Sequence, residues 1–234
     1  MLLNKDKRQV SGQVSIVTRS PEATRLLSAF FAIWKIPTVE DLTSAQVVLV
    51  ELGLSHGAPE ENVIWLTPLP IENRPYLELP LQLPLLSRCI EERFFTTARR
   101  QLRVAMDLPV QIVTEGLRQE ARLISLSGRG ARLSCPGEFA KGQKLELDVV
   151  LGGRSLRLPA EVLYTLPAGD LSDHKDPQAG VLFKPIDLQI FEGISRFVEC
   201  VCLEEACSRA GFPVTAACVS WVNVPRNPWS VMPD

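Results

Sequence analysis

One alternating segment limits the possible folds of this chain more than any other. In residues 144–150, KLELDVV, apolar and charged residues alternate without interruption. Gly152-Gly153 follows, and the alternation resumes in residues 154–166, RSLRLPAEVLYTL. Two glycines between two such runs are typical of a two-residue hairpin turn. The segment therefore predicts an antiparallel β-hairpin with one apolar face.

Other short strands surround this hairpin in the sequence. The segments LPVQIV (108–113), EARLISL (120–126) and AGVLFKPI (179–186) have strand composition and are separated by turn residues. Several short strands with one apolar face indicate a small β-barrel. Residues 187–211 then place apolar side chains at helical spacing and predict a closing helix.

The first part of the chain follows a different pattern. Ser20-Pro21-Glu22 supplies an N-cap, a proline for the first turn and an acidic side chain, which predicts a helix over residues 22–35. A second helix is expected over residues 85–98. Short apolar segments, typical of buried parallel strands, occupy residues 13–18, 46–52 and 62–67. We therefore expect an α/β domain over residues 1–98, a barrel with its helix over 99–211, and a tail over 212–234 whose role the pattern does not define.

Composition excludes several functional classes. The net charge of −2 argues against partners bound through a basic surface, so we expect neither a nucleic acid polymer nor a membrane as partner. The segment MLLNKDKRQ is charged where a secretory signal is apolar, and no run of about 18 apolar residues occurs, so we expect a cytoplasmic protein. The six cysteines form no CxxC pair, which favours structural thiols. The polar residues 170–178 could form a metal site, but a solvated loop is favoured and no metal is expected. No catalytic motif occurs, so no enzyme is predicted.

Residues 99–103, RRQLR, form the densest basic cluster in the chain. Arg99, Arg100 and Arg103 would repel one another unless an anion neutralises them. A guanidinium group makes paired hydrogen bonds both to phosphate and to the O6/N7 edge of guanine. The cluster therefore suits a guanine nucleotide with several phosphates. A solvated linker, or pairing with Glu91 and Glu92, is the alternative.

A second motif lies in residues 123–133, LISLSGRGARL. Ser125 and Ser127 place two hydroxyl groups on one side of a strand end, where they can donate and accept hydrogen bonds. Gly130 permits a close approach of backbone or ligand. By itself this segment is a polar turn.

Together the two motifs resemble those of the PilZ domain, a bacterial receptor module for cyclic di-GMP. That family has an RxxxR motif, matched by Arg99 and Arg103, and a D/NxSxxG motif, matched at Ser127 and Gly130. The resemblance implies a six-stranded barrel that binds the dinucleotide on its outside, with these four residues as ligand contacts and Arg100 as an additional one. Ser125 stands where the family has Asp or Asn, and one lost charged hydrogen bond costs about 1.5–3 kcal/mol, so weakened binding is expected. No further cofactor is implied.

The α/β part resembles a response-regulator receiver domain that has lost its chemistry. Thr18 and Arg19 stand in place of its acidic pair, Glu51 in place of the phosphoacceptor aspartate, and Leu79-Pro80 lacks its lysine. Thr67 fits its Ser/Thr position. Without the acidic pair no Mg²⁺ is held, so the resemblance implies that phosphorylation does not occur.

These features lead to two hypotheses. The first is a non-enzymatic cyclic di-GMP effector in which the ligand orders the linker and reorients the N-terminal domain toward an unidentified protein partner, with a homodimer possible. The second is a protein–protein adaptor that works without nucleotide, with both domains degenerate.

Overall fold

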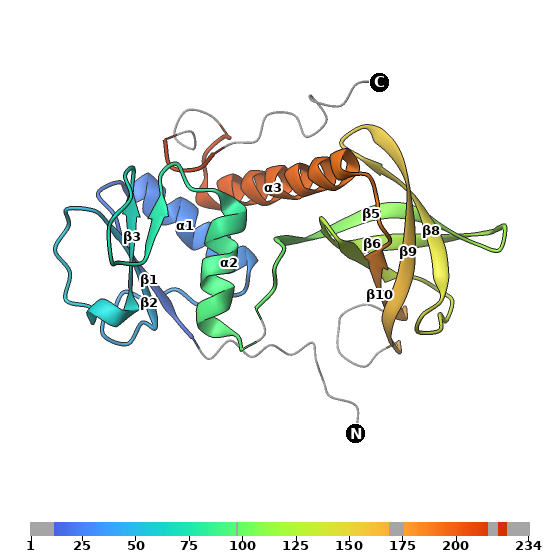
Figure 1. Ribbon diagram of the computed structural model, residues 1–234, viewed down its shortest axis with the longest axis horizontal. Coiled ribbons are helices and arrows are strands. Elements are labelled where there is room, and N and C mark those ends of the chain that lie inside the picture. Colours follow the sequence, from blue (N-terminus) through green and yellow to red (C-terminus); the bar gives the residue numbers. More distant parts are fainter. Residues whose placement is uncertain (1–11, 97, 169–175, 215–219, 224–234) are drawn as a thin grey trace. The chain divides into compact units, whose positions relative to one another are not determined.

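The structure is a computed structural model that describes residues 12–96, 98–168, 176–214 and 220–223. The chain forms two compact units, coloured along the sequence in Figure 1. One unit contains the described residues up to Arg100 and those from Cys202 onward, and the other contains the described residues from Gln101 to Val201. The division falls within helix α3 (Leu188–Ala210).

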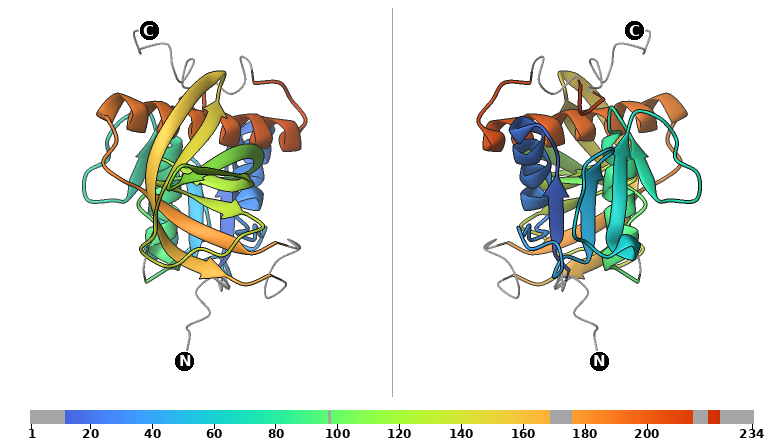
Figure 2. Two further views of the ribbon diagram at one scale, coloured as in Figure 1. Left: turned by 90° about the vertical axis from the view of Figure 1, so that its right-hand side faces the viewer. Right: turned by 90° about the vertical axis from the view of Figure 1, so that its left-hand side faces the viewer.

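The first unit is built on a parallel sheet, seen in the right-hand view of Figure 2. Its four strands lie in the order β1-β2-β3-β4. Their bounds are β1 Val14–Val17, β2 Val47–Glu51, β3 Val63–Thr67 and β4 Tyr76–Glu78. Thr38 forms a parallel bridge with Val14, so the segment between β1 and β2 adds a short edge next to β1. Counting that edge, the spatial order is 2-1-3-4-5, as in flavodoxin-like doubly wound folds.

The two helices α1 (Pro21–Ile33) and α2 (Leu83–Phe94) share one apolar core with the sheet. Leu27 and Phe31 of α1 and Leu86 and Ile90 of α2 are buried in it. The other side of the sheet has a second core, around Trp65, which is covered by loop residues, and no α-helix of the described segments contributes to it. The reason is length: residues 52–62 and 68–75 connect parallel strands but are too short for a full crossover helix, and only the 3₁₀-helix Glu60–Asn62 forms there.

The helix boundaries show what local sequence determines. α1 begins as predicted, with the Ser20 hydroxyl accepting from the Ala23 N–H at 3.2 Å. The prediction for the second helix was wrong at both ends. It begins at Leu83, because Pro84 fits the first turn, and it ends at Phe94, because Phe95 is extended with φ −131°. Strand β4 was not predicted, since three residues between prolines carry no clear period.

The second unit is a closed barrel of six antiparallel strands (Figure 2, left). Around the barrel their order is β10-β7-β6-β5-β8-β9. The strands are β5 Arg103–Thr114, β6 Leu117–Ser127, β7 Gly130–Ser134, β8 Lys144–Leu151, β9 Arg154–Leu166 and β10 Gln178–Phe183. Gly152 and Gly153 have φ values of 58° and 87° and join β8 to β9, which confirms the predicted two-residue turn.

The predicted fold class is confirmed: an α/β part with a parallel sheet, followed by a six-stranded barrel and a C-terminal helix. Among the described helices, none combines the length and apolar character needed to span a membrane. Five cysteines lie in the described ranges, and no disulfide joins any two of them. Of the polar residues 170–178, considered above as a metal site, residues 170–175 lie outside the described residues.

Candidate functional site

The arginine segment follows α2 and leads into β5. Leu102 is buried, Arg100 is exposed, and Arg99 and Arg103 are half-buried. The Arg99 N–H donates to Glu91 Oε2 at 3.1 Å, and the Arg99 guanidinium Nη1 lies 4.0 Å from Glu91 Oε1. An ion pair this long at the surface contributes at most about 1 kcal/mol.

This contact is one half of the predicted alternative, in which the arginines pair with Glu91 and Glu92. Glu92 is engaged elsewhere, since its Oε1 accepts from Arg88 Nε at 2.7 Å. Within the described ranges no carboxylate pairs with Arg100 or Arg103. Two of the three arginines therefore present guanidinium groups that no described acidic side chain neutralises.

The serine–glycine motif forms the hairpin between β6 and β7. The Ser127 hydroxyl donates to the Gly130 carbonyl oxygen at 3.1 Å, and Ser127 is buried. A Cβ atom on Gly130 would lie 2.3 Å from the Val181 carbonyl oxygen, so only glycine fits against the backbone of β10. The close approach predicted for Gly130 is thus to backbone, and Ser127 closes the turn.

Strand register places four predicted residues on neighbouring strands of the barrel. Arg103 on β5 is directly opposite Ser127 on β6, and Ser127 is opposite Gly130 on β7. We call these three residues the first row. Ser125, two residues before Ser127, is half-buried. Side chains opposite each other across antiparallel strands share a face, and Val104 and Leu126 fill the barrel interior, so the first row and Ser125 face outward.

Arg99 and Arg100 belong to the other compact unit. The barrel by itself therefore brings together Arg103, Ser125, Ser127 and Gly130, and not all six predicted residues. Gln101, which follows Arg100 in the chain, lies near the same hairpin: its Oε1 is 3.1 Å from the position that a Cβ on Gly128 would take.

The sequence did not reveal what the tip of this hairpin contacts. A Cβ on Gly128 would lie 2.4 Å from Ser195 Oγ and 3.0 Å from Phe191 Cε2 of α3. The Arg129 guanidinium lies over the Phe191 ring, 5.9 Å from its centroid. Glycine at position 128 thus lets side chains of α3 lie directly against the hairpin, and the signal for this contact in the sequence was the additional glycine in SGRG.

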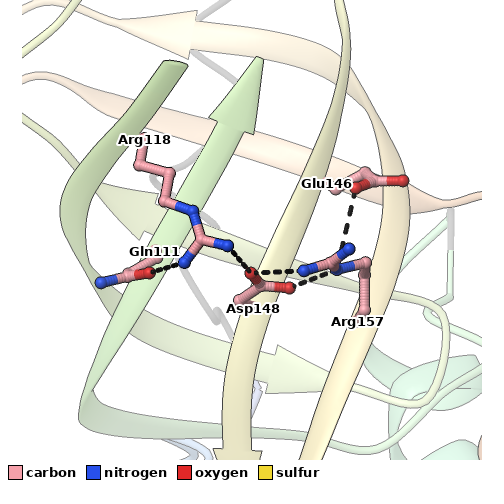
Figure 3. Close-up of polar contacts among 5 residues, drawn as sticks. All are labelled: Gln111, Arg118, Glu146, Asp148 and Arg157. Atoms are coloured by element: carbon pink, nitrogen blue, oxygen red, sulfur yellow. Dashed lines mark hydrogen bonds and ion pairs between the residues drawn. The ribbon is translucent and has the colours of Figure 1, made fainter. Parts of the chain in front are cut away.

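A different part of the outer barrel face carries arginines that are already neutralised (Figure 3). Arg157 donates from Nε and Nη2 to the two Asp148 carboxylate oxygens at 2.8 and 3.2 Å. Arg118 donates to Gln111 Oε1 at 3.1 Å and lies 4.0 Å from Asp148. The hydrogen bonds from Arg157 hold the pKa of Asp148 below its usual value. This network lines an open groove of about 930 Å³, but its paired arginines offer less to an anion than Arg103 does.

The carboxyl end of the parallel sheet also holds an ion pair. Arg19 donates from its backbone N–H and from Nη1 to the Glu51 carboxylate, at 2.7 and 2.8 Å. Thr67 is fully buried, and its hydroxyl bonds to the backbone of Leu69. Arg19, Glu51 and Thr67 thus make contacts within this unit, and the loss of phosphorylation stays a prediction.

Fold and motifs together define a class of domain: a small closed antiparallel barrel with arginines at its entry and a serine–glycine hairpin on its outer face. The family model of the PilZ domain matches residues 97–200, and this part of the chain is a PilZ domain. No such match extends to the α/β unit, whose resemblance to receivers stays a prediction.

Several solved structures are similar to this chain. The inhibitor of motility MotI/DgrA of Bacillus subtilis is 17% identical with a TM-score of 0.39; the match covers 44% of this chain and only 50% of that one. The PilZ domain of YcgR from Escherichia coli with c-di-GMP is 16% identical with a TM-score of 0.40, covering 49% of this chain and 98% of that one. The PilZ domain of CeSA from a cellulose-synthesizing bacterium is 19% identical with a TM-score of 0.33, covering 42% and 96%. No curated protein matches the sequence.

Proposed function

We propose that this protein is a cyclic di-GMP receptor that signals through its PilZ domain. The single observation that carries the proposal is the first row: Arg103, Ser127 and Gly130 lie side by side on the outer face of a PilZ domain. Arg103 supplies a guanidinium group that no described carboxylate neutralises. A doubly charged dinucleotide can neutralise this guanidinium group, because both its phosphates and its guanine edges form paired hydrogen bonds with arginine.

The predicted residues take different roles in this proposal. Arg103 is the main anchor on the barrel. Ser127 and Gly130 act as positioning residues, because the serine hydroxyl closes the hairpin and the glycine lets β7 lie against β10. Arg99 and Arg100 join the ligand from the linker, and Arg99 exchanges its 4.0 Å contact with Glu91 for the ligand.

Signal output follows from ordering of the linker. Ligand phosphates neutralise the arginines, the linker takes one conformation, and the α/β unit is reoriented toward a protein partner. Such a change requires that the ligand bind the two arrangements with different affinity. No catalytic step is involved.

Isothermal titration calorimetry of the full chain with cyclic di-GMP tests the proposal. Arg103→Ala removes charge-assisted hydrogen bonds worth about 1.5–3 kcal/mol, so affinity should fall about 10- to 150-fold. Arg118→Ala is the matched control: Arg118 is an exposed arginine of the same barrel, bonded to Gln111, and its loss should leave affinity unchanged. Absence of binding by the unmodified chain at hundred-micromolar ligand would refute the proposal.

A nucleotide-independent adaptor is the second candidate. It is favoured by Ser125 in the family's Asp/Asn position and by the contact of Arg99 with Glu91. Capture of the same partner protein with and without cyclic di-GMP distinguishes the two functions, because an adaptor would bind its partner equally in both.

A further inference from the structure

A second row of paired residues crosses the same outer face of the barrel. Ser125 on β6 is opposite Arg132 on β7, Arg132 is opposite Gly180 on β10, and Gly180 is opposite Tyr164 on β9. Ala131 and Leu133 are buried in the barrel core, so alternation along β7 turns Arg132 outward. This second row lies two residues along β6 from the first row.

Gly180 lets the Tyr164 ring lie across β10. A Cβ on Gly180 would lie 2.2 Å from Tyr164 Cε1, 2.3 Å from Cζ and 2.8 Å from the hydroxyl oxygen. The phenol end of the ring therefore occupies the space above Gly180 and points toward the strand that carries Arg132. Tyr164 is only half-buried, so part of the ring is open to solvent.

Tyr164 on β9 and Arg132 on β7 flank Gly180 on the same face, and an aromatic ring and a guanidinium group placed in this way suit a purine base. A base stacked on an aromatic side chain gains about 1–3 kcal/mol. Arginine in addition reads the O6/N7 edge of guanine with paired hydrogen bonds, which adenine cannot accept in the same way. Ser125, beside Arg132, offers only a hydroxyl group where the family has a side chain that accepts more strongly.

We propose that Tyr164 and Arg132 form the base-binding part of the cyclic di-GMP site, with Tyr164 stacking on one guanine and Arg132 selecting guanine over adenine. This inference rests on the proposed function. It extends the site from the hairpin across β7 and β10 to β9, and it assigns specificity to residues outside the two sequence motifs. Spacing supports it, because neighbouring strands lie about 5 Å apart and the whole second row is within the length of one dinucleotide.

The test is calorimetric titration of the full chain with cyclic di-GMP and, separately, cyclic di-AMP. Tyr164→Leu keeps apolar cover over Gly180 but removes the ring, and should weaken cyclic di-GMP binding about tenfold or more. Tyr164→Phe keeps the ring and should bind as the unmodified chain does. Arg132→Ala should reduce the preference for cyclic di-GMP over cyclic di-AMP by about tenfold or more.

Two controls make the outcomes distinct. Tyr76→Leu removes the other tyrosine, which lies on the parallel sheet, and should leave binding unchanged. Circular dichroism of each variant checks that the barrel is folded. If the unmodified chain binds and Arg103→Ala does not, while Tyr164→Leu and Arg132→Ala match the unmodified chain with both ligands, this inference is overturned and the proposed function stands. If the unmodified chain does not bind cyclic di-GMP at all, both fall.

Discussion

Replacing Gly130 by alanine tests whether this motif residue is needed for the packing of the barrel or for direct contact with the ligand. The added methyl group would lie 2.3 Å from the Val181 carbonyl oxygen, whereas real Cβ contacts are essentially never shorter than 3.0 Å. The difference, 3.0 minus 2.3, is about 0.7 Å of movement that backbone on β7 or β10 must provide. Both strands belong to a closed barrel, so neither can move alone.

We expect a clear loss of stability. Overpacking of this kind costs about 1–3 kcal/mol. For a domain of roughly this size 1 kcal/mol lowers the melting temperature by about 4–8 °C, so the barrel should melt about 5–20 °C lower. Three of the four tryptophans, Trp34, Trp65 and Trp221, belong to the first unit, so tryptophan fluorescence does not report on the barrel alone. Differential scanning calorimetry without ligand is therefore the assay.

Gly57→Ala is the matched control. No atom lies within 4 Å of the Cβ position at Gly57, and its φ is not in the left-handed region. Alanine there should leave the melting temperature unchanged or raise it slightly. If Gly130→Ala melts with the unmodified chain yet loses cyclic di-GMP affinity, the packing argument is refuted and Gly130 acts on the ligand directly.

Three further predictions concern other residues of the barrel. Ser125→Asn restores an amide acceptor without adding charge beside Arg132, so the affinity for cyclic di-GMP measured by calorimetry should rise about tenfold. Ser125→Ala provides no acceptor, so an equal gain in that variant would contradict this reasoning. Burial raises the pKa of Cys135 to about 11 from 9.0, so the unfolded chain loses that proton first. The free energy of unfolding of the protein, measured by urea titration, should therefore fall by up to about 2–3 kcal/mol between pH 9 and pH 11. In Cys135→Ala this contribution to the pH dependence should be absent. Asp148→Asn breaks exposed pairs, so urea denaturation should show a small loss of unfolding free energy that vanishes in high salt; a large, salt-independent loss would show that the network is structurally essential.

Interactions between residues close together in the chain allowed the helices and strands of this protein to be predicted from its sequence. The start of α1 at Ser20-Pro21 and the β8–β9 turn at Gly152-Gly153 depend on residues within one turn of each other, so no distant contact could overrule them. The end of α2 depends on how the chain leaves toward the linker, and it was mispredicted. The arginine and serine–glycine motifs were found because each is contiguous.

The amino-acid sequence thus determined the kinds of elements, their order and the two motifs, since periodicity and turn chemistry act locally. Only the tertiary structure decided which side chains meet. Pairing of β10 with both β7 and β9 places Gly180 between Arg132 and Tyr164 and lays the Tyr164 ring over Gly180, although Arg132 and Gly180 are far apart along the chain. Local turns fix the register within a hairpin, but the pairing of β10 with β7 joins strands that are not consecutive, so it depends on the packing of the whole barrel.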